Sequence, residues 1–151
     1  MTLDRVSAWP ARKGSAFFDR YVSSPYSVAL PDLNDRSPMT KFADRKCKPC
    51  EGDVAPLTAE QAVESLAAVH ESWTLSADGK SIVREFSFPS FSRTIAFTNA
   101  VAWIATVEGH HPEMTVSYSR CMVSYKTTAI DGLSDNDFIC AAKIDRIFTD
   151  S

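Results

Sequence analysis

Apolar positions in the C-terminal two thirds of the chain recur at helical spacing in three stretches. The first follows Thr58, which opens a Thr-x-x-Gln capping box, and runs to about His70. The second and longest spans residues 91–108, where apolar residues form two adjacent rows. The third begins after Ser134, a good helix cap, and has acidic residues in its first turn. The pattern therefore predicts three helices.

Four shorter runs instead alternate between apolar and polar residues, which is typical of strands. They cover residues 73–75, 82–88, 115–118 and 121–127. A glycine-containing connection joins the first two runs and Ser119-Arg120 joins the last two, so each pair is predicted to form a hairpin. Arg84 shares a face with apolar residues, which indicates a sheet edge or a subunit interface.

The combined order α-β-β-α-β-β-α predicts an α+β fold, a four-stranded antiparallel sheet with three helices packed on one face. At 151 residues, the chain is expected to hold one such domain and an extension. Residues 1–45 contain four prolines and no glutamate, and they are basic and serine-containing. They are predicted to be a disordered extension or a targeting segment, which leaves the domain at 46–151.

The overall charge and hydropathy exclude some classes of partner. The net charge of −3 gives no electrostatic reason to expect nucleic-acid binding. No apolar run approaches the roughly 18 residues that would span a bilayer. We expect a cytoplasmic protein, or a mitochondrial or plastid one if residues 1–45 are a transit peptide.

A Cys-x-x-Cys motif, Cys47 to Cys50, lies just before the first predicted helix. Such a pair can be half of a zinc site or a redox motif. The sequence offers no second ligand pair, and the strand and helix that would flank a redox motif are not evident. The favoured interpretation is two reduced thiols in a loop.

The candidate chemistry centres on Gly109-His110-His111-Pro112, which follows the longest predicted helix. Glycine accepts the positive φ at which helices end, and proline forces the residue before it into an extended conformation. The two imidazoles are therefore expected in a tight helix-to-strand connection. Acid–base catalysis, a metal site completed by Glu108, Glu113 or Cys121, and a purely structural turn are all compatible with this pattern.

Further motifs recur in order along the chain at characteristic separations. After His110-His111-Pro112 come Tyr118 and the segment 131–138, Asp-Gly-Leu-Ser-Asp-Asn-Asp-Phe. The Cys-x-Pro-Cys loop, the Phe86-Ser87-Phe88 strand and the Ala-Lys-Ile-Asp segment at 142–145 accompany them. From about residue 47 to 148 the chain resembles the pterin-4a-carbinolamine dehydratase family.

The resemblance implies a lyase that dehydrates 4a-hydroxytetrahydrobiopterin to quinonoid dihydropterin and water during tetrahydrobiopterin recycling. No metal or organic cofactor is implied, and family members form homodimers and homotetramers. His110 and His111 would be the catalytic residues, with His110 in acid–base catalysis and His111 in pterin binding, or the reverse. Pro112, Thr128 and Glu108 would complete the substrate-binding set.

Two positions depart from the family pattern. Active members usually carry an acidic residue four positions before the histidine pair, where this chain has Thr106. They also carry a third histidine ten residues after the tyrosine, where this chain has Thr128. The alternative hypothesis is therefore a catalytically weak or inactive relative that acts as a pterin-binding, dimerisation or assembly partner.

Overall fold

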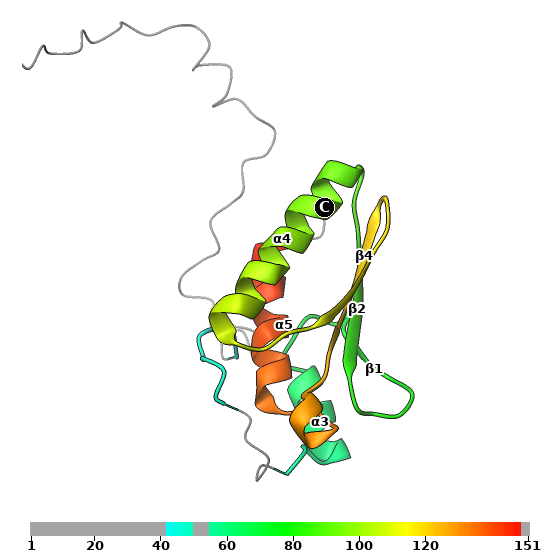
Figure 1. Cartoon of the computed structure of the whole chain (residues 1–151). Helices are drawn as coiled ribbons and strands as arrows, with labels where there is room; N and C mark the ends of the chain where they lie inside the picture. Colours follow the sequence, from blue (N-terminus) through cyan, green and yellow to red (C-terminus); the bar gives the residue numbers. More distant parts are fainter. Residues whose placement is uncertain (1–41, 50–54, 149–151) are drawn as a thin grey trace, which may run out of the picture. The chain divides into compact units, whose positions relative to one another are not determined.

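The computed structural model describes residues 42–49 and 55–148. Residues 1–41 and Cys50 lie outside this range, and so do the predictions made for them. The described helices and strands follow the predicted order, as Figure 1 shows: α3 (Ala59–Leu66), β1 (Thr74–Leu75), β2 (Ile82–Ser87), α4 (Phe91–Glu108), β3 (Glu113–Val116), β4 (Arg120–Tyr125), a 3₁₀ turn (Thr128–Ile130) and α5 (Asp135–Ile147).

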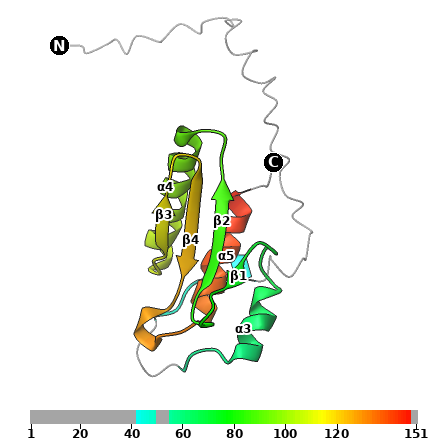
Figure 2. The same ribbon diagram turned by 90° about the vertical axis from the view of Figure 1, so that its right-hand side faces the viewer.

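The strands form one antiparallel sheet in the order β1-β2-β4-β3 among the described residues. Every pair of neighbours is antiparallel, and β2–β4 is the longest ladder, running from Ile82↔Tyr125 to Ser87↔Arg120. The strands stand in front of α4 and α5 in Figure 2, which leaves the helices on the far face of the sheet. The predicted α+β fold, with three helices on one face, is confirmed.

Local capping interactions fix where two of the helices begin. Thr58 and Gln61 form the predicted reciprocal capping box at α3. Ser134 caps α5 in the same way, with Asp137 as its reciprocal partner. Helix α3 nevertheless ends at Leu66, earlier than predicted, and the backbone N–H of His70 instead donates to Asp145 on α5. Beyond Leu66 the chain makes tighter turns and then a tertiary contact in place of further helical hydrogen bonds.

The third and fourth strands begin earlier than the alternation of residues predicts. Strand β3 starts at Glu113, directly after Pro112, and β4 starts at Arg120. The connection is the turn 117–119, which the Ser117 N–H closes by donating to the carbonyl of Arg120 at 2.8 Å. The predicted hairpin is present, with its turn shifted toward the N-terminus.

Arg84 does not lie at a sheet edge, so that interpretation was wrong. Strand β2 runs between β1 and β4, and Arg84 is only 3% exposed. Its guanidinium donates to Oδ1 of Asp145 at 2.7 Å, and it lies 4.5 Å from the ring centre of Phe86. A carboxylate from α5 pairs with this arginine inside the core, and the pattern of a single strand cannot indicate such a partner.

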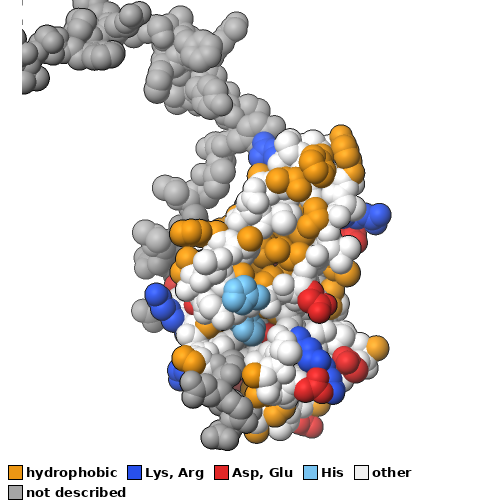
Figure 3. Space-filling model, in the orientation of Figure 1, with side chains coloured by type: hydrophobic (Ala, Val, Ile, Leu, Met, Phe, Trp, Pro, Cys, Tyr) orange, Lys and Arg blue, Asp and Glu red, His pale blue; other side chains and the backbone are white. Residues whose placement is uncertain are grey.

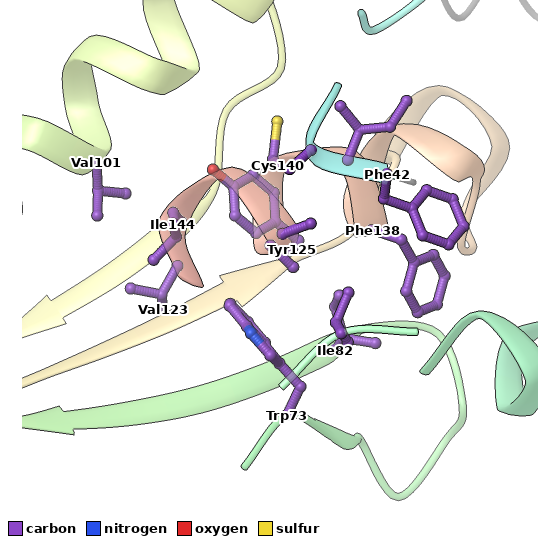
Figure 4. Close-up of a cluster of buried hydrophobic side chains, with 14 of the residues drawn as sticks. Phe42, Trp73, Ile82, Val101, Val123, Tyr125, Phe138, Cys140 and Ile144 are labelled. Carbon is purple, nitrogen blue, oxygen red and sulfur yellow. The ribbon is translucent and has the colours of Figure 1, made fainter. Parts of the chain in front are cut away.

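The hydrophobic core fills the space between the sheet and α5. Figure 4 shows Trp73, Ile82 and Val123 on the sheet side and Ile144 on α5 as part of one cluster. Phe86 joins α4 to this core, because its ring centre lies 4.5 Å from that of Phe97. The sheet therefore has one face buried under helices, and these helices leave its opposite face uncovered.

The segment 42–49 belongs to this packed unit. Phe42 and Ala43 are buried in the core, and the ring of Phe42 lies 6.0 Å from that of Phe138 on α5. Arg146 of α5 donates to Asp44 at 2.7 Å. Residues just before Cys47 are thus fastened to α5 by apolar packing and by an ion pair.

Within the described ranges no helix is long and apolar enough to cross a membrane.

Candidate active site

The two adjacent histidines lie on opposite faces of the sheet. Gly109 ends α4 in the left-handed conformation (φ 65°, ψ 25°), as its position predicts, and its N–H donates to the carbonyl of Ala105. The chain then extends through His110 and His111 into β3, and successive side chains of an extended chain point in opposite directions. His110 therefore packs on the helix side, and His111 faces the opposite side.

His110 forms a buried pair with Asp137 of α5. Its Nε2 lies 2.7 Å from Oδ1 of Asp137, whose side chain has no exposed surface. The second carboxylate oxygen accepts hydrogen bonds from Thr127 Oγ1 at 2.8 Å and from the Ser134 N–H at 2.7 Å. Three donors thus satisfy this carboxylate and hold the imidazole at a fixed position.

The ring of Tyr125 supports the other side of this pair. It stacks on His110 with a centroid distance of 5.6 Å and an interplanar angle of 11°. Burial raises the pKa of the Tyr125 phenol, and the neighbouring Cys140 raises it further. Tyr125 therefore stays neutral at physiological pH and contributes a flat surface that fixes the orientation of the imidazole.

A polar cavity of about 240 Å³ lies on the face of the sheet opposite Tyr125. It is lined by side chains from β3 and β4 and from the segments that adjoin the strands: Ser81, His111, Glu113, Ser124, Lys126 and Thr128. The strand register explains this grouping, because Glu113 is paired with Ser124 across the β3–β4 ladder. Figure 3 shows histidine side chains at the molecular surface beside basic and acidic ones.

The structure brings together only part of the substrate-binding set predicted from the sequence. His111 and Thr128 line the cavity, whereas Pro112 and Glu108 do not. Glu108 instead accepts hydrogen bonds from Lys143 Nζ at 2.8 Å and from the Cys47 N–H at 2.9 Å. Burial opposes ionisation of Glu108, but these two bonds outweigh burial and lower its pKa. Its carboxylate thus joins α4, α5 and the segment 42–49.

Thr106 also points away from the cavity. Its hydroxyl donates to the carbonyl of Ala102 one turn earlier in α4, at 2.8 Å, and the residue is exposed. The side chain therefore makes a local helix contact and does not line the cavity of His111 and Thr128.

An exposed ionic cluster borders the cavity beside Thr128. Lys126 donates to Asp131 Oδ1 at 2.5 Å, and Lys80 donates to the other carboxylate oxygen. These two hydrogen bonds lower the pKa of Asp131 to about 2. Asp131 has a φ of 48°, a conformation that is uncommon outside glycine, and the two lysines hold its carboxylate in place.

The substrate-binding set predicted from the sequence lacks four residues that line the cavity, which are Ser81, Glu113, Ser124 and Lys126. It also lacks Asp137, the buried partner of His110. Asp137 lies in the first turn of a predicted helix, where a carboxylate interacts favourably with the helix dipole. Its position in the sequence therefore indicated only a role at the helix start. Lys126 directly follows β4 and continues its alternation of buried and more exposed positions, as any solvent-facing residue there would. Neither pattern carries information about a partner far away in sequence. Among the described residues no group of three or more histidine, cysteine or acidic side chains is arranged to hold a metal ion.

Comparison with known proteins identifies the class of protein that this fold and site define. A family model described as pterin 4 alpha carbinolamine dehydratase matches residues 55–147. The chain belongs to this family, as the sequence motifs predicted.

Individual relatives agree with this assignment. A protein of Nitrosomonas eutropha, provisionally named pterin-4-alpha-carbinolamine dehydratase, is 55% identical over 106 residues, which cover 70% of this chain and 92% of the relative. A protein of Legionella pneumophila with the same provisional name is 45% identical over 109 residues, covering 72% and 96%. A crystal structure from Brucella melitensis, described as a transcriptional coactivator/pterin dehydratase, aligns with a TM-score of 0.58 at 30% identity, covering 61% of this chain and 97% of that one.

Proposed function

We propose that this protein dehydrates 4a-hydroxytetrahydropterins, such as 4a-hydroxytetrahydrobiopterin, to the quinonoid dihydropterin and water. Tetrahydrobiopterin recycling needs this step after each turnover of an aromatic amino-acid hydroxylase. The observation that carries the proposal is the shared cavity of His111 and Thr128 in a member of the dehydratase family. Hydroxyl, carboxylate and ammonium groups around the same cavity suit a flat heterocycle rich in hydrogen-bonding groups.

The reaction needs one proton delivered and one removed. The 4a-hydroxyl leaves as water when it is protonated, and a ring N–H loses its proton as the C=N bond forms. An imidazole titrates near neutrality and can serve either step, so no metal or organic cofactor is required. We assign this acid–base role to His111, because its side chain lines the cavity and is exposed to a bound pterin.

His110 has a different role in this proposal. Its Nε2 is engaged by Asp137, and the residue is nine-tenths buried. We therefore assign it to positioning: the buried pair fixes the backbone from which His111 projects. The family resemblance allows either histidine to be the acid–base group and the other to bind the pterin. The geometry favours His111 as the acid–base group. Pro112 keeps this backbone extended, and Glu108 anchors the end of α4 to α5.

The test uses the purified full chain and 4a-hydroxytetrahydropterin generated by a hydroxylase. Formation of the quinonoid product is followed by absorbance and compared with the spontaneous rate. We expect acceleration by the wild-type chain and a loss of about 10²–10⁴-fold in His111→Ala. His70→Ala is the matched control, because it removes an imidazole that does not line the cavity and should leave the rate unchanged. No acceleration by the wild type would refute the dehydratase proposal.

A second candidate function is pterin binding without efficient turnover. It is favoured by Thr128, whose neutral hydroxyl can hydrogen-bond a pterin but is a poor proton shuttle. In this role the chain would act as a dimerisation or assembly partner. Calorimetric titration with a stable tetrahydropterin measures binding, and the dehydration assay measures turnover. Binding without acceleration of dehydration supports this candidate, and binding with acceleration supports the dehydratase.

We further propose a homodimer or homotetramer. Helix α4 carries exposed apolar side chains at Trp103 and Val107, one turn apart on the same side of the helix, with exposures of 70% and 52%. Apolar side chains gather over this face in Figure 3. Covering such a surface with a second copy would remove it from water.

The cytoplasm is the proposed compartment, with a mitochondrion or plastid as the alternative.

A further inference from the structure

Two cysteines far apart in sequence lie in direct contact behind the candidate active site. Sγ of Cys47 is 3.7 Å from Sγ of Cys140. Cys140 belongs to α5 and has no exposed surface, whereas Cys47 is half-buried in the segment that precedes α3. A reagent in solution therefore has access to Cys47 but not to Cys140.

Several polar interactions hold Cys47 against α5. The neighbouring Lys48 exchanges two hydrogen bonds with the side chain of Asn136: its N–H donates at 3.0 Å and its carbonyl accepts at 2.7 Å. The N–H of Cys47 donates to Glu108 at 2.9 Å. Backbone on both sides of the thiol is thus fixed to side chains of α5 and α4, so the two sulfurs are kept together by contacts other than their own.

We propose that Cys47 and Cys140 are a modification site, a thiol pair that a low-molecular-weight disulfide such as oxidised glutathione converts reversibly into an intramolecular disulfide. A disulfide requires an S–S separation of about 2.0 Å, which small side-chain rotations can reach from the observed contact. The bond joins the segment 42–49 covalently to α5. This inference does not depend on the proposed dehydratase activity.

The exchange has two steps. The Cys47 thiolate attacks one sulfur of oxidised glutathione, which forms a mixed disulfide and releases the first glutathione. Cys140 then loses its proton to water and attacks Sγ of Cys47, which forms the protein disulfide and releases the second glutathione. The two protein thiols lose two electrons and two protons, and the glutathione disulfide is reduced to two thiols.

The surroundings of Cys47 control the rate of the first step. The hydrogen bond with Cys140, burial and the nearby charge of Glu108 all raise the pKa of the Cys47 thiol. Because only the thiolate attacks, exchange is slow at neutral pH and becomes faster as the pH rises. Lys143, which donates to Glu108, partly offsets this shift. The pair therefore resists brief exposure to oxidant and responds to sustained oxidation.

The experiment incubates the full wild-type chain in mixtures of reduced and oxidised glutathione at neutral pH and at about pH 9. Peptide mass spectrometry without reduction should find the Cys47 and Cys140 peptides joined with the loss of two hydrogens. The bond should form faster at the higher pH and should disappear with dithiothreitol. The oxidised chain should also have a higher Tm, because the link constrains a long loop in the unfolded state.

Three variants separate this bond from other thiol chemistry. Cys50→Ser removes the neighbouring thiol of the Cys-x-x-Cys motif and should leave the Cys47–Cys140 link intact. Cys121→Ser, which removes a buried cysteine with a threonine neighbour, should also leave it intact. Cys140→Ser should abolish both the link and the rise in Tm. A wild-type chain that forms Cys47–Cys50, only a glutathione adduct, or no disulfide at about pH 9 would overturn the proposal.

Discussion

Nε2 of His110 lies 2.7 Å from Oδ1 of Asp137, a carboxylate with no exposed surface. The pair joins the connection between α4 and β3 to the first turn of α5, 27 residues further along the chain. His111, the next residue, projects to the other face of the sheet and into the polar cavity. The buried pair therefore fixes the backbone that presents His111 to a ligand.

Replacing Asp137 should destabilise the fold. Asp137→Ala removes an acceptor shared by His110, Thr127 and Ser134, and leaves their polar atoms buried without it. We expect a loss of about 3–5 kcal/mol in the free energy of unfolding, measured by urea denaturation with circular dichroism. Asp135→Ala, in the same helical turn but with a half-exposed side chain paired to Arg45, should cost less than about 1 kcal/mol. Equal losses in the two variants would contradict the structural role given to Asp137.

Restoring an imidazole at position 128 should increase the rate of dehydration. Thr128 is exposed at the cavity that His111 lines, so Thr128→His places a second titratable group beside the substrate. A positioned general acid or base commonly contributes about 10²–10⁴-fold in rate, and we expect a gain in kcat toward that range. The control is Thr106→His, on the exposed side of α4, which should leave kcat unchanged. A gain of the same size in both variants would argue against a specific effect at the cavity.

The Asp131 cluster should make stability depend on pH in the acidic range. The pKa of Asp131 falls from the ordinary 3.8 to about 2 through hydrogen bonds from Lys126 and Lys80. A depressed carboxyl pKa stabilises the fold above the unfolded-state pKa, and this contribution is lost as the pH falls from 3.8 toward 2. In Asp131→Asn the free energy of unfolding should therefore fall less steeply over that interval.

Asparagine is the appropriate replacement, because it also tolerates the positive φ of this position. The cluster is exposed, so high salt should reduce the difference between wild type and Asp131→Asn. Urea denaturation at a series of pH values, with and without salt, measures both effects. Parallel pH dependences in the two proteins would show that the lysines do not stabilise the ionised carboxylate.

Disrupting the apolar face of α4 should change the oligomeric state. Trp103 is 70% exposed, and Trp103→Glu places a charge on the apolar surface of α4 that the second copy would cover. We expect the wild type to be a dimer or tetramer and this variant to have a lower molar mass by light scattering after gel filtration. Val63→Glu, at a 58% exposed position on α3, is the control and should leave the molar mass unchanged. A monomeric wild type would contradict the proposed assembly.

Most of the fold could be predicted from the sequence because its signals are local. Periods of 3.6 and 2 residues identified the helices and strands, and Thr58 and Ser134 marked two helix starts through bonds within one turn. Gly109 likewise marked the end of α4. Boundaries moved where a distant group intervened: Asp145 of α5 accepts from the His70 N–H, and α3 ends before that residue.

The sequence by itself determined the order of the elements and the presence of two histidines and a proline at one helix-to-strand turn. The family motifs also pointed to Thr128 as a position in the site. Only the tertiary structure decided that His110 points toward Asp137 and His111 toward the cavity. It also paired Arg84 with Asp145 and Cys47 with Cys140. These relationships depend on which strands are neighbours and on how α5 crosses the sheet. Side-chain spacing along one element cannot encode them, because the partners come together only when the sheet and helices pack.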